Sequence, residues 1–141
     1  MYISWMTCLC PIVFGQDNDQ LKQLLKTGST KEAIAEIRNL NESKDGSLLI
    51  EALMHKEMAV RASAMYKLKN NPEKTFVHKM LDYLERNNFT QEGSEIAAVH
   101  VRLMQIAIAY IETATGRSMG IKNIDNLKEV SAAIASARSA K

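Results

Sequence analysis

The sequence has few cysteine, proline and aromatic residues, and each shortage argues against a class of structure. Both cysteines, Cys8 and Cys10, lie within the first ten of 141 residues. The rest of the chain therefore has no thiol for a disulfide, a cysteine-ligated metal or a cysteine nucleophile. Two prolines and 6% aromatic residues, beside abundant Ala, Leu, Ile and Met, favour helices over strands. We therefore predict an all-α fold.

An excess of charge of one sign is also lacking. The 18 Lys and Arg residues face 16 Asp and Glu residues, which gives a formal net charge of +2, and the charges are scattered. This distribution does not indicate a nucleic-acid partner. With 46% apolar residues, the chain has the size and composition of one domain with a continuous core.

Residues 1–15 form a separate apolar segment. They contain eleven apolar side chains and no charge, and a polar stretch begins at Gln16. As a helix the segment would be only ~22 Å long, short of the ~30 Å hydrocarbon core of a bilayer, so no stable membrane span is expected. We predict a signal peptide at 1–15, with 16–141 exported to the periplasm or secreted. Because no Lys or Arg precedes Lys22, the alternative is a cytoplasmic protein whose N-terminal segment packs into the core.

From Asp17 onward, apolar residues recur at helical spacing between short polar breaks, which predicts about seven helices. Short connections make consecutive helices pack antiparallel. The expected helices lie near 18–27, from Ser29 to Leu40, near 46–55, near 57–70, from Pro72 to Leu84, near 94–115, and around Leu127 and Val130.

Several residues have the form of helix start signals. Ser29 with Glu32 three positions later matches a capping box, in which each side chain satisfies a backbone donor at the helix start. Asp45 can cap the helix near 46–55 through its carboxylate. Asn71 followed by Pro72 marks both the end of one helix and the start of the next.

One helical hairpin resembles a known repeat. Residues 48–53, read together with 59–68, resemble a HEAT-like repeat of the phycobilisome-lyase type found in small exported bacterial domains. The resemblance implies a right-handed stack of antiparallel hairpins, a short α-solenoid, over 16–141 with a C-terminal capping helix. A second Val-Arg pair follows the first after 41 residues, close to the roughly 40-residue period of such arrays. The repeat positions implied are Leu53, Val60, Arg61, Ala64, Leu68, Val101 and Arg102.

The chain departs from the family's pattern at two places. Gln105 stands where the repeat expects Ala, and His55, Lys56 and Glu57 replace the usual Asp between the two helices. We expect Glu57 to hold Arg61 at i, i+4 spacing instead. A helical bundle without repeats is the alternative fold.

No catalytic, cofactor or metal site is predicted. His55, His78 and His100 lie on or beside three different expected helices and form no recognised ligand spacing. The i, i+4 pairs His78 with Asp82 and Glu51 with His55 are interpreted as solvated contacts. The basic loop from Gly116 to Gly120 could bind an anion through backbone donors, but we interpret it as a turn before the last helix.

These patterns favour a non-catalytic protein–protein interaction module or scaffold. Stacked hairpins present a concave surface that can hold a peptide or protein partner. The alternative is a small helical-bundle enzyme or ligand carrier with a pocket between helices around His78 or His100. The two differ in their response to substitution, because only a pocket protein should depend on these histidines.

Overall fold

The structure of the chain, a computed structural model, describes residues 22–26, 29–42, 44–87 and 94–140. Every regular element in these ranges is helical and none is a strand, so the predicted all-α class is confirmed. The expected signal peptide at 1–15 lies outside the described residues. After a helical stretch at 22–26, the elements are α2 (Thr30–Arg38), α3 (Gly46–Ala52), α4 (Met58–Leu68), the 3-10 turn η1 (Lys74–Phe76), α5 (Val77–Asn87), α6 (Ser94–Thr115) and α7 (Leu127–Ser139).

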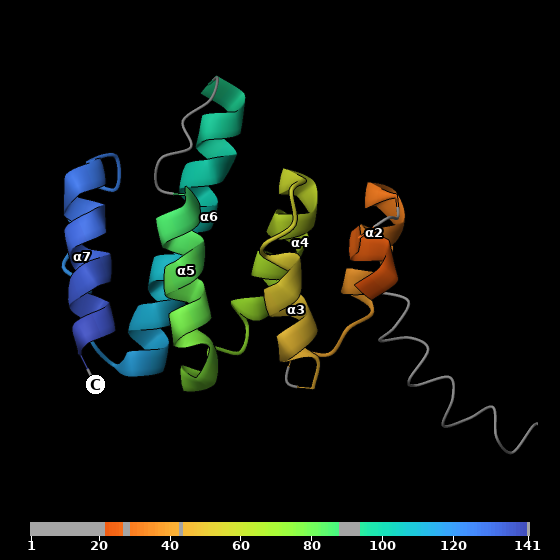
Figure 1. Ribbon diagram of the computed structural model, residues 1–141, viewed down its shortest axis with the longest axis horizontal. Helices are drawn as coiled ribbons and strands as arrows, with labels where there is room; N and C mark the ends of the chain where they lie inside the picture. The colour runs from red at the N-terminus through yellow and green to blue at the C-terminus, as the bar shows by residue number, and fades with distance from the viewer. Residues whose placement is uncertain (1–21, 27–28, 43, 88–93, 141) are drawn as a thin grey trace, which may run out of the picture.

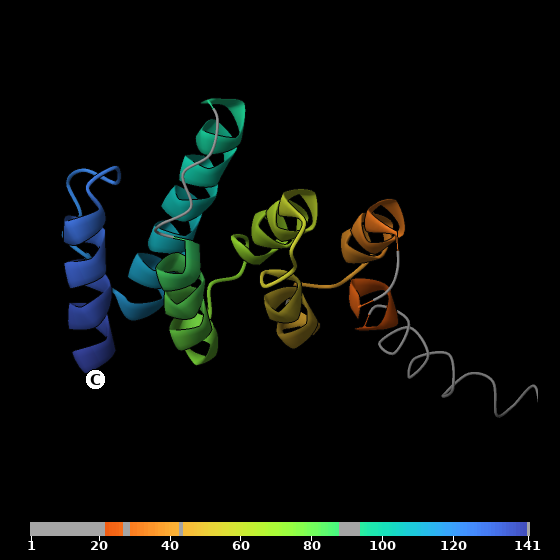
Figure 2. The ribbon, with the colours of Figure 1, turned by 45° about the horizontal axis from the view of Figure 1, so that its top comes forward.

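The helices follow one another along the long axis of the molecule (Figures 1 and 2). The helix α2 lies toward one end, α3 and α4 come next, then α5 and α6, and α7 lies at the other end. The chain direction reverses between α3 and α4 and again between α5 and α6, as the colours of Figure 1 show. Packing joins α2 to α4, α3 to α4, α4 to α6, α5 to α6 and α5 to α7.

One apolar core runs through these contacts. Each helix buries a stripe at the spacing of three or four residues that brings side chains to one face. In α5, for example, Met80, Leu81 and Leu84 are buried, whereas His78 and Lys79, on the other face of the helix, are exposed. The largest fully buried side chains come from α2, α3 and the residue that follows it, α4, α5 and α6: Ile37, Leu49, Leu53, Met65, Leu68, Met80, Tyr83, Leu84, Leu103, Tyr110 and Ile111.

Side-chain caps begin two of the helices. The Ser29 hydroxyl accepts a hydrogen bond from the amide of Glu32 at 3.5 Å, which is the Ser29 half of the predicted capping box. Asn126 caps α7 by accepting from the amide of Glu129 at 3.1 Å. The Glu129 carboxylate in turn accepts from the backbone amides of Lys122 and Asn123, which fixes the loop that leads into α7.

The predicted cap at Asp45 was wrong in its geometry. Asp45 does precede α3, but its backbone (φ −106°, ψ 22°) is not extended and its side chain makes no bond to the helix amides. Its carboxylate instead accepts from the Asn41 amide at 2.8 Å, which closes the loop between α2 and α3. A local loop bond competes here with the capping bond.

The segment between α4 and α5 also differs from the prediction. Pro72 lies ahead of the 3-10 turn at 74–76, so it does not occupy the first position of α5. The extended Glu73 separates them and donates its amide to the hydroxyl of Tyr110 on α6 at 3.0 Å. This hydrogen bond to another helix therefore keeps Glu73 extended, and α5 begins later in the sequence than predicted.

Close packing of α3 against η1 requires glycine at one position. A Cβ added to Gly46 would lie 2.7 Å from Cε2 of Phe76. Because atoms cannot approach that closely without displacement, any larger residue would push the Phe76 ring away. We term α3 with α4 the first hairpin, and α5 with α6 the second. Gly46 thus allows the start of the first hairpin to contact η1, which leads into the second.

Candidate functional site

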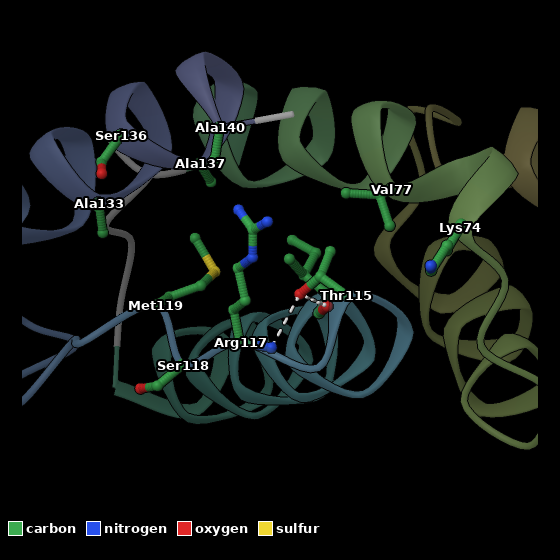
Figure 3. A pocket seen from close by; sticks show the side chains of 11 residues that line it. Lys74, Val77, Thr115, Arg117, Ser118, Met119, Ala133, Ser136, Ala137 and Ala140 are labelled. Atoms are coloured by element: carbon green, nitrogen blue, oxygen red, sulfur yellow. Dashed lines mark hydrogen bonds between the residues drawn. The ribbon is translucent and has the colours of Figure 1, made fainter.

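A groove lies between α5, α6 and α7, and we term it the C-terminal groove (Figure 3). Its volume is about 550 Å³. Its lining comes from four elements and the loop after α6: Lys74, Val77, Ile111, Thr115, Arg117, Ser118, Met119, Ala133, Ser136, Ala137 and Ala140.

Small side chains on α7 leave room for the groove. The positions of α7 that face it are alanine or serine, whereas Val130 and Ile134 on the adjoining face are buried in the core. The end of α7 is tied to α5 through Arg138, whose Nη2 lies 2.7 Å from Asp82 Oδ1 and 3.6 Å from Glu85 Oε1. The helix α7, which forms one wall of the groove, is therefore held in place by apolar packing along one face and by ion pairs at its C-terminal end.

The loop from Gly116 to Gly120 forms the base of the groove. Both glycines have φ of +72°, a conformation that glycine adopts without the strain of other residues. The Met119 amide donates to Glu112 Oε2 at 2.8 Å. The Arg117 amide donates to the Thr115 hydroxyl at 3.3 Å.

These bonds decide between the two interpretations of the loop. The Gly120 amide donates to the Ser118 hydroxyl at 3.0 Å and the Gly116 amide to the Glu112 carbonyl at 2.8 Å, so four of the loop's backbone donors already have acceptors within the chain. They are not available to an anion, and the loop acts as the turn before α7 that its sequence favoured. The loop's positive charge enters the groove through the Arg117 side chain instead (Figure 3).

The charge of the C-terminal groove is of one sign. Lys74 and Arg117 contribute positive groups, and none of the described residues that line the groove is acidic. Val77, Ile111 and Met119 supply its apolar surface. The groove thus combines apolar side chains with two basic residues, one in η1 and one in the loop after α6.

A smaller groove of about 280 Å³ lies between the end of α4 and the outer face of α6. We term it the α4–α6 groove. Its charged residues are Lys69 and Arg102, and its remaining lining is Pro72, Gln105, Ile106, Ala109, Tyr110 and Thr113. Arg102, expected to occupy a repeat position, is exposed here on the surface of α6.

Arg61, Tyr83 and His100 form a buried polar cluster from α4, α5 and α6. Tyr83 is 0% exposed and His100 is 4% exposed. Arg61 Nη1 donates to the backbone oxygens of His55 and Lys56, both at 2.8 Å. Arg61 Nε, the Tyr83 hydroxyl and His100 Nε2 are buried without a hydrogen-bond partner in the described part of the chain.

Burial dominates the acid–base properties of this cluster. It raises the pKa of Tyr83 to about 12, and the nearby positive charge of Arg61 offsets only part of that rise. Burial also lowers the pKa of His100; a hydrogen bond with the backbone of Asn87 opposes this, and the charge of Arg61 lowers it further. At neutral pH the phenol is therefore protonated, and burial favours the uncharged imidazole.

The cluster has residue types found in active sites but not the geometry of one. A general base or nucleophile must reach a substrate, and these groups are closed off by the packed helices. Neither His100 nor His78 lines either of the two grooves described here. A buried polar atom without a hydrogen-bond partner costs about 1–3 kcal/mol of folding free energy, so the cluster also lowers the stability of the fold.

The expected repeat positions divide into two environments. Leu53, Val60, Ala64 and Leu68 are buried in the first hairpin. In the second, Val101 is half-buried and Arg102 is exposed.

The expected ion pair between Glu57 and Arg61 is replaced by another arrangement. Arg61 binds the two backbone oxygens of the loop before α4, and Glu57 occupies the N-cap position of that helix. The Glu57 amide donates to His55 Nδ1 at 3.0 Å, which gives His55 a local role in the same turn. Sequence spacing identified Arg61 correctly as a contact residue but not its acceptors.

Asp82, at i, i+4 spacing from His78, has its partner on another helix. Asp82 pairs with Arg138 on α7, and no group of three or more potential metal ligands occurs in the described part of the chain. Among the same residues, no helix combines the length and apolarity needed to cross a membrane.

Comparisons with protein-family models, with curated proteins and with solved structures found no match to this chain.

Proposed function

We propose that this chain is a non-catalytic protein-interaction module, built on a short right-handed stack of HEAT-like hairpins. In this proposal, a peptide segment of a protein partner binds in the C-terminal groove.

Contacts between second neighbours support the stacked arrangement. The helix α4 packs on both α2 and α6, and α5 packs on α7, so each hairpin touches the next. In a solenoid, each repeat contacts only its neighbours. A closed bundle would gather all its helices around one shared core, whereas α2 and α7 lie near opposite ends of this molecule (Figure 2).

The observation that carries the functional proposal is the preformed C-terminal groove. Its volume of about 550 Å³ lies within the range of roughly 300–1,000 Å³ typical of ligand pockets. Internal hydrogen bonds hold its base, and ion pairs hold the end of its α7 wall. A partner would therefore meet a groove whose shape needs little reorganisation, which lowers the cost of binding.

A display experiment tests this proposal. The full chain is used to select binders from a random peptide library displayed on phage, and selected peptides are tested against two variants of α7. Ser136→Phe fills the groove from an exposed lining position, while Ala135→Phe places the same ring at an exposed position outside the lining. We expect Ser136→Phe to abolish binding and Ala135→Phe to retain it.

Two results would contradict the proposal. One is a failure to select any peptide, and the other is a set of peptides that bind both variants equally well. Thermal denaturation of both variants followed by circular dichroism shows whether each has kept its fold.

The enzyme or ligand-carrier alternative has less support from the described residues. His100 is buried beside Arg61 and Tyr83, and His78 is exposed on α5 and is not among the lining residues of either groove. A change in ligand-induced stabilisation on His78→Ala or His100→Ala would favour this alternative.

Export remains part of the proposal. Mass spectrometry of the protein purified from its natural source is the direct measurement. A mature N-terminus at Gln16 supports a signal peptide at 1–15, and retention of Met1 contradicts it.

A further inference from the structure

Two large apolar side chains are exposed next to the α4–α6 groove. Tyr66 on α4 and Val99 on α6 are each 43% exposed, and they are the exposed large hydrophobic residues of the described part of the chain. Each lies three residues before a cation of the groove, Lys69 or Arg102, and residues at this spacing are neighbours on a helix surface. Single apolar side chains scattered over a surface need no explanation, but two that flank one groove indicate a contact surface.

The charges of this groove are positive. Arg102 is exposed, and none of the residues three or four positions away from it on α6 is acidic. The Lys69 ammonium lies 5.3 Å from the centroid of the Tyr66 ring, a cation–π contact that orients the side chain without neutralising its charge. No salt bridge among the described residues includes either cation. Both positive charges therefore remain uncompensated on this surface.

Two acidic residues adjoin the groove lining in the sequence, and both carboxylates are directed elsewhere. The Glu73 carboxylate lies toward α3, with Oε2 3.4 Å from the position of a Cβ on Gly46. The Glu112 carboxylate accepts the Met119 amide in the loop after α6. Neither residue lines the groove, so its surface favours an occupant of negative charge.

The size of the groove suits the side chains of a larger partner. Its volume of about 280 Å³ is just below the roughly 300–1,000 Å³ of small-molecule pockets. Ile106 and Tyr110 are 6% and 2% exposed, so the apolar floor of the groove belongs to the packed core. Gln105 and Thr113 are exposed and add an amide and a hydroxyl that can bind a peptide backbone.

We propose that the α4–α6 groove binds an acidic segment of a protein partner, through Asp or Glu carboxylates that face Arg102 and Lys69. An apolar side chain next to the acid covers the exposed surface of Tyr66 and Val99. Arg102 can hold a carboxylate through two parallel N–H groups, whereas Lys69 acts as a point charge, so Arg102 contributes more to recognition. This surface is separate from the C-terminal groove, and the inference does not depend on that groove binding a partner.

Two groove-filling variants define where a peptide binds. Ala109→Phe places a ring at an exposed lining position of the α4–α6 groove, whereas Ser136→Phe fills the C-terminal groove. Peptides selected on the full chain from a random phage library are assigned to the α4–α6 groove when they bind Ser136→Phe but not Ala109→Phe. We expect this set to be enriched in Asp and Glu next to aliphatic or aromatic residues. Circular dichroism during thermal denaturation shows whether each variant keeps its fold.

Charge reversal then tests the two cations. Fluorescence anisotropy measures the affinity of one such peptide for Arg102→Glu, Lys69→Glu and Lys128→Glu, the last being a matched change at an exposed position of α7 outside both grooves. We expect binding to weaken about tenfold with Arg102→Glu, about fivefold with Lys69→Glu and less than about twofold with Lys128→Glu. A version of the peptide with Asn and Gln in place of its acids should bind the original chain about tenfold more weakly.

The outcomes separate this inference from the proposed function. Peptides of the α4–α6 groove without acidic enrichment, or equal losses in all three charge variants, overturn the acidic partner. If Ala109→Phe blocks no selected peptide while Ser136→Phe does, this inference is overturned and the proposed function is supported. The reverse result supports this surface and contradicts the proposed site. A single-stranded oligonucleotide that binds with the same dependence on Arg102, in place of any peptide, would assign the groove to nucleic acid and overturn the inference.

Discussion

The two Val-Arg pairs lie in different surroundings although their sequences are alike. In α4, Val60 is fully buried and Arg61 binds two loop carbonyls. In α6, Val101 is half-buried and Arg102 is exposed on the α4–α6 groove. The identity of a dipeptide therefore does not determine its role, because the surrounding apolar stripe determines which face of the helix is buried.

The buried stripes themselves do correspond. Val60, Ala64 and Leu68 are buried at intervals of four on α4. Leu103, Ala107 and Ile111 are buried at the same intervals on α6. The small buried residue of this stripe is Ala107, two positions after Gln105, where the repeat pattern expected it.

The largest expected effect tests the apolar core of the first hairpin. Leu49 on α3 is 0% exposed, so Leu49→Ala should lower the free energy of unfolding by about 2–5 kcal/mol through lost burial and a cavity. Urea denaturation followed by circular dichroism measures it. Val99→Ala at a position 43% exposed on α6 is the control, with a change within about 0.5 kcal/mol. A similar small change at Leu49 would show that this core is loosely packed.

Arginine substitutions sharpen the contrast between the two pairs. Arg61→Lys removes the planar group that reaches two carbonyls and should cost about 0.5–1.5 kcal/mol, because one part-buried and one exposed hydrogen bond are lost or weakened. Arg102→Lys should change stability by no more than about 0.5 kcal/mol. Equal losses in urea denaturation would instead indicate that both arginines hold their hairpins in the same way.

Two tyrosines in the second hairpin allow a finer comparison. Tyr110→Phe removes the acceptor of the Glu73 amide and should cost about 1 kcal/mol. Tyr83→Phe removes a buried hydroxyl without a partner and should leave stability unchanged or raise it. A loss at Tyr83 that equals the loss at Tyr110 would mean that its hydroxyl is satisfied in solution.

Alkaline pH tests the same Tyr83 hydroxyl. Its pKa of about 12 exceeds the ordinary value of 10.0, so the unfolded chain loses this proton first as the pH rises. Stability from this group is complete below pH 10.0 and declines as the pH approaches 12, by about 1.4 kcal/mol per unit of pKa difference. Tyr83→Phe should reduce the slope of stability against pH in this range.

Acid pH should give the smallest effect, through His100. Burial holds its folded pKa below 6.5, so the unfolded chain takes up the proton first as the pH falls. The contribution of this group is complete above pH 6.5 and is lost as the pH falls through that value toward the folded pKa. In urea denaturation over this range, His100→Gln should have a weaker pH dependence than the original chain, and an unchanged profile would contradict the assignment.

The helices were predictable because their periodicity is local. The bounds of α6 agree with the segment expected near 94–115, and the Ser29 cap is present. The cap of α3 and the start of α5 differed because Asp45 and Glu73 bind partners outside their own helices. Helix propensity alone does not predict when a hydrogen bond to another part of the chain will compete with a helix cap or a helix start.

The grooves and the polar cluster were harder to predict. Sequence drew attention to the loop around Arg117 and to Arg61, but not to the alanines of α7, which read as ordinary helix residues. The approach of Tyr83 and His100 to Arg61 depends on three helices packing together, and the spacing of these residues in the sequence does not predict it. Only their residue types, which are common in functional sites, could have indicated a polar cluster.

The attachment of α7 has a consequence for how the protein opens. This helix packs chiefly on α5, through Val130, Ile134 and the ion pairs of Arg138. Such a terminal element can detach as a cooperative unit while the rest of the chain remains folded. Added salt screens the ion pairs at its exposed end, so amide hydrogens of α7 should exchange sooner than those of α4, and the difference should widen with ionic strength.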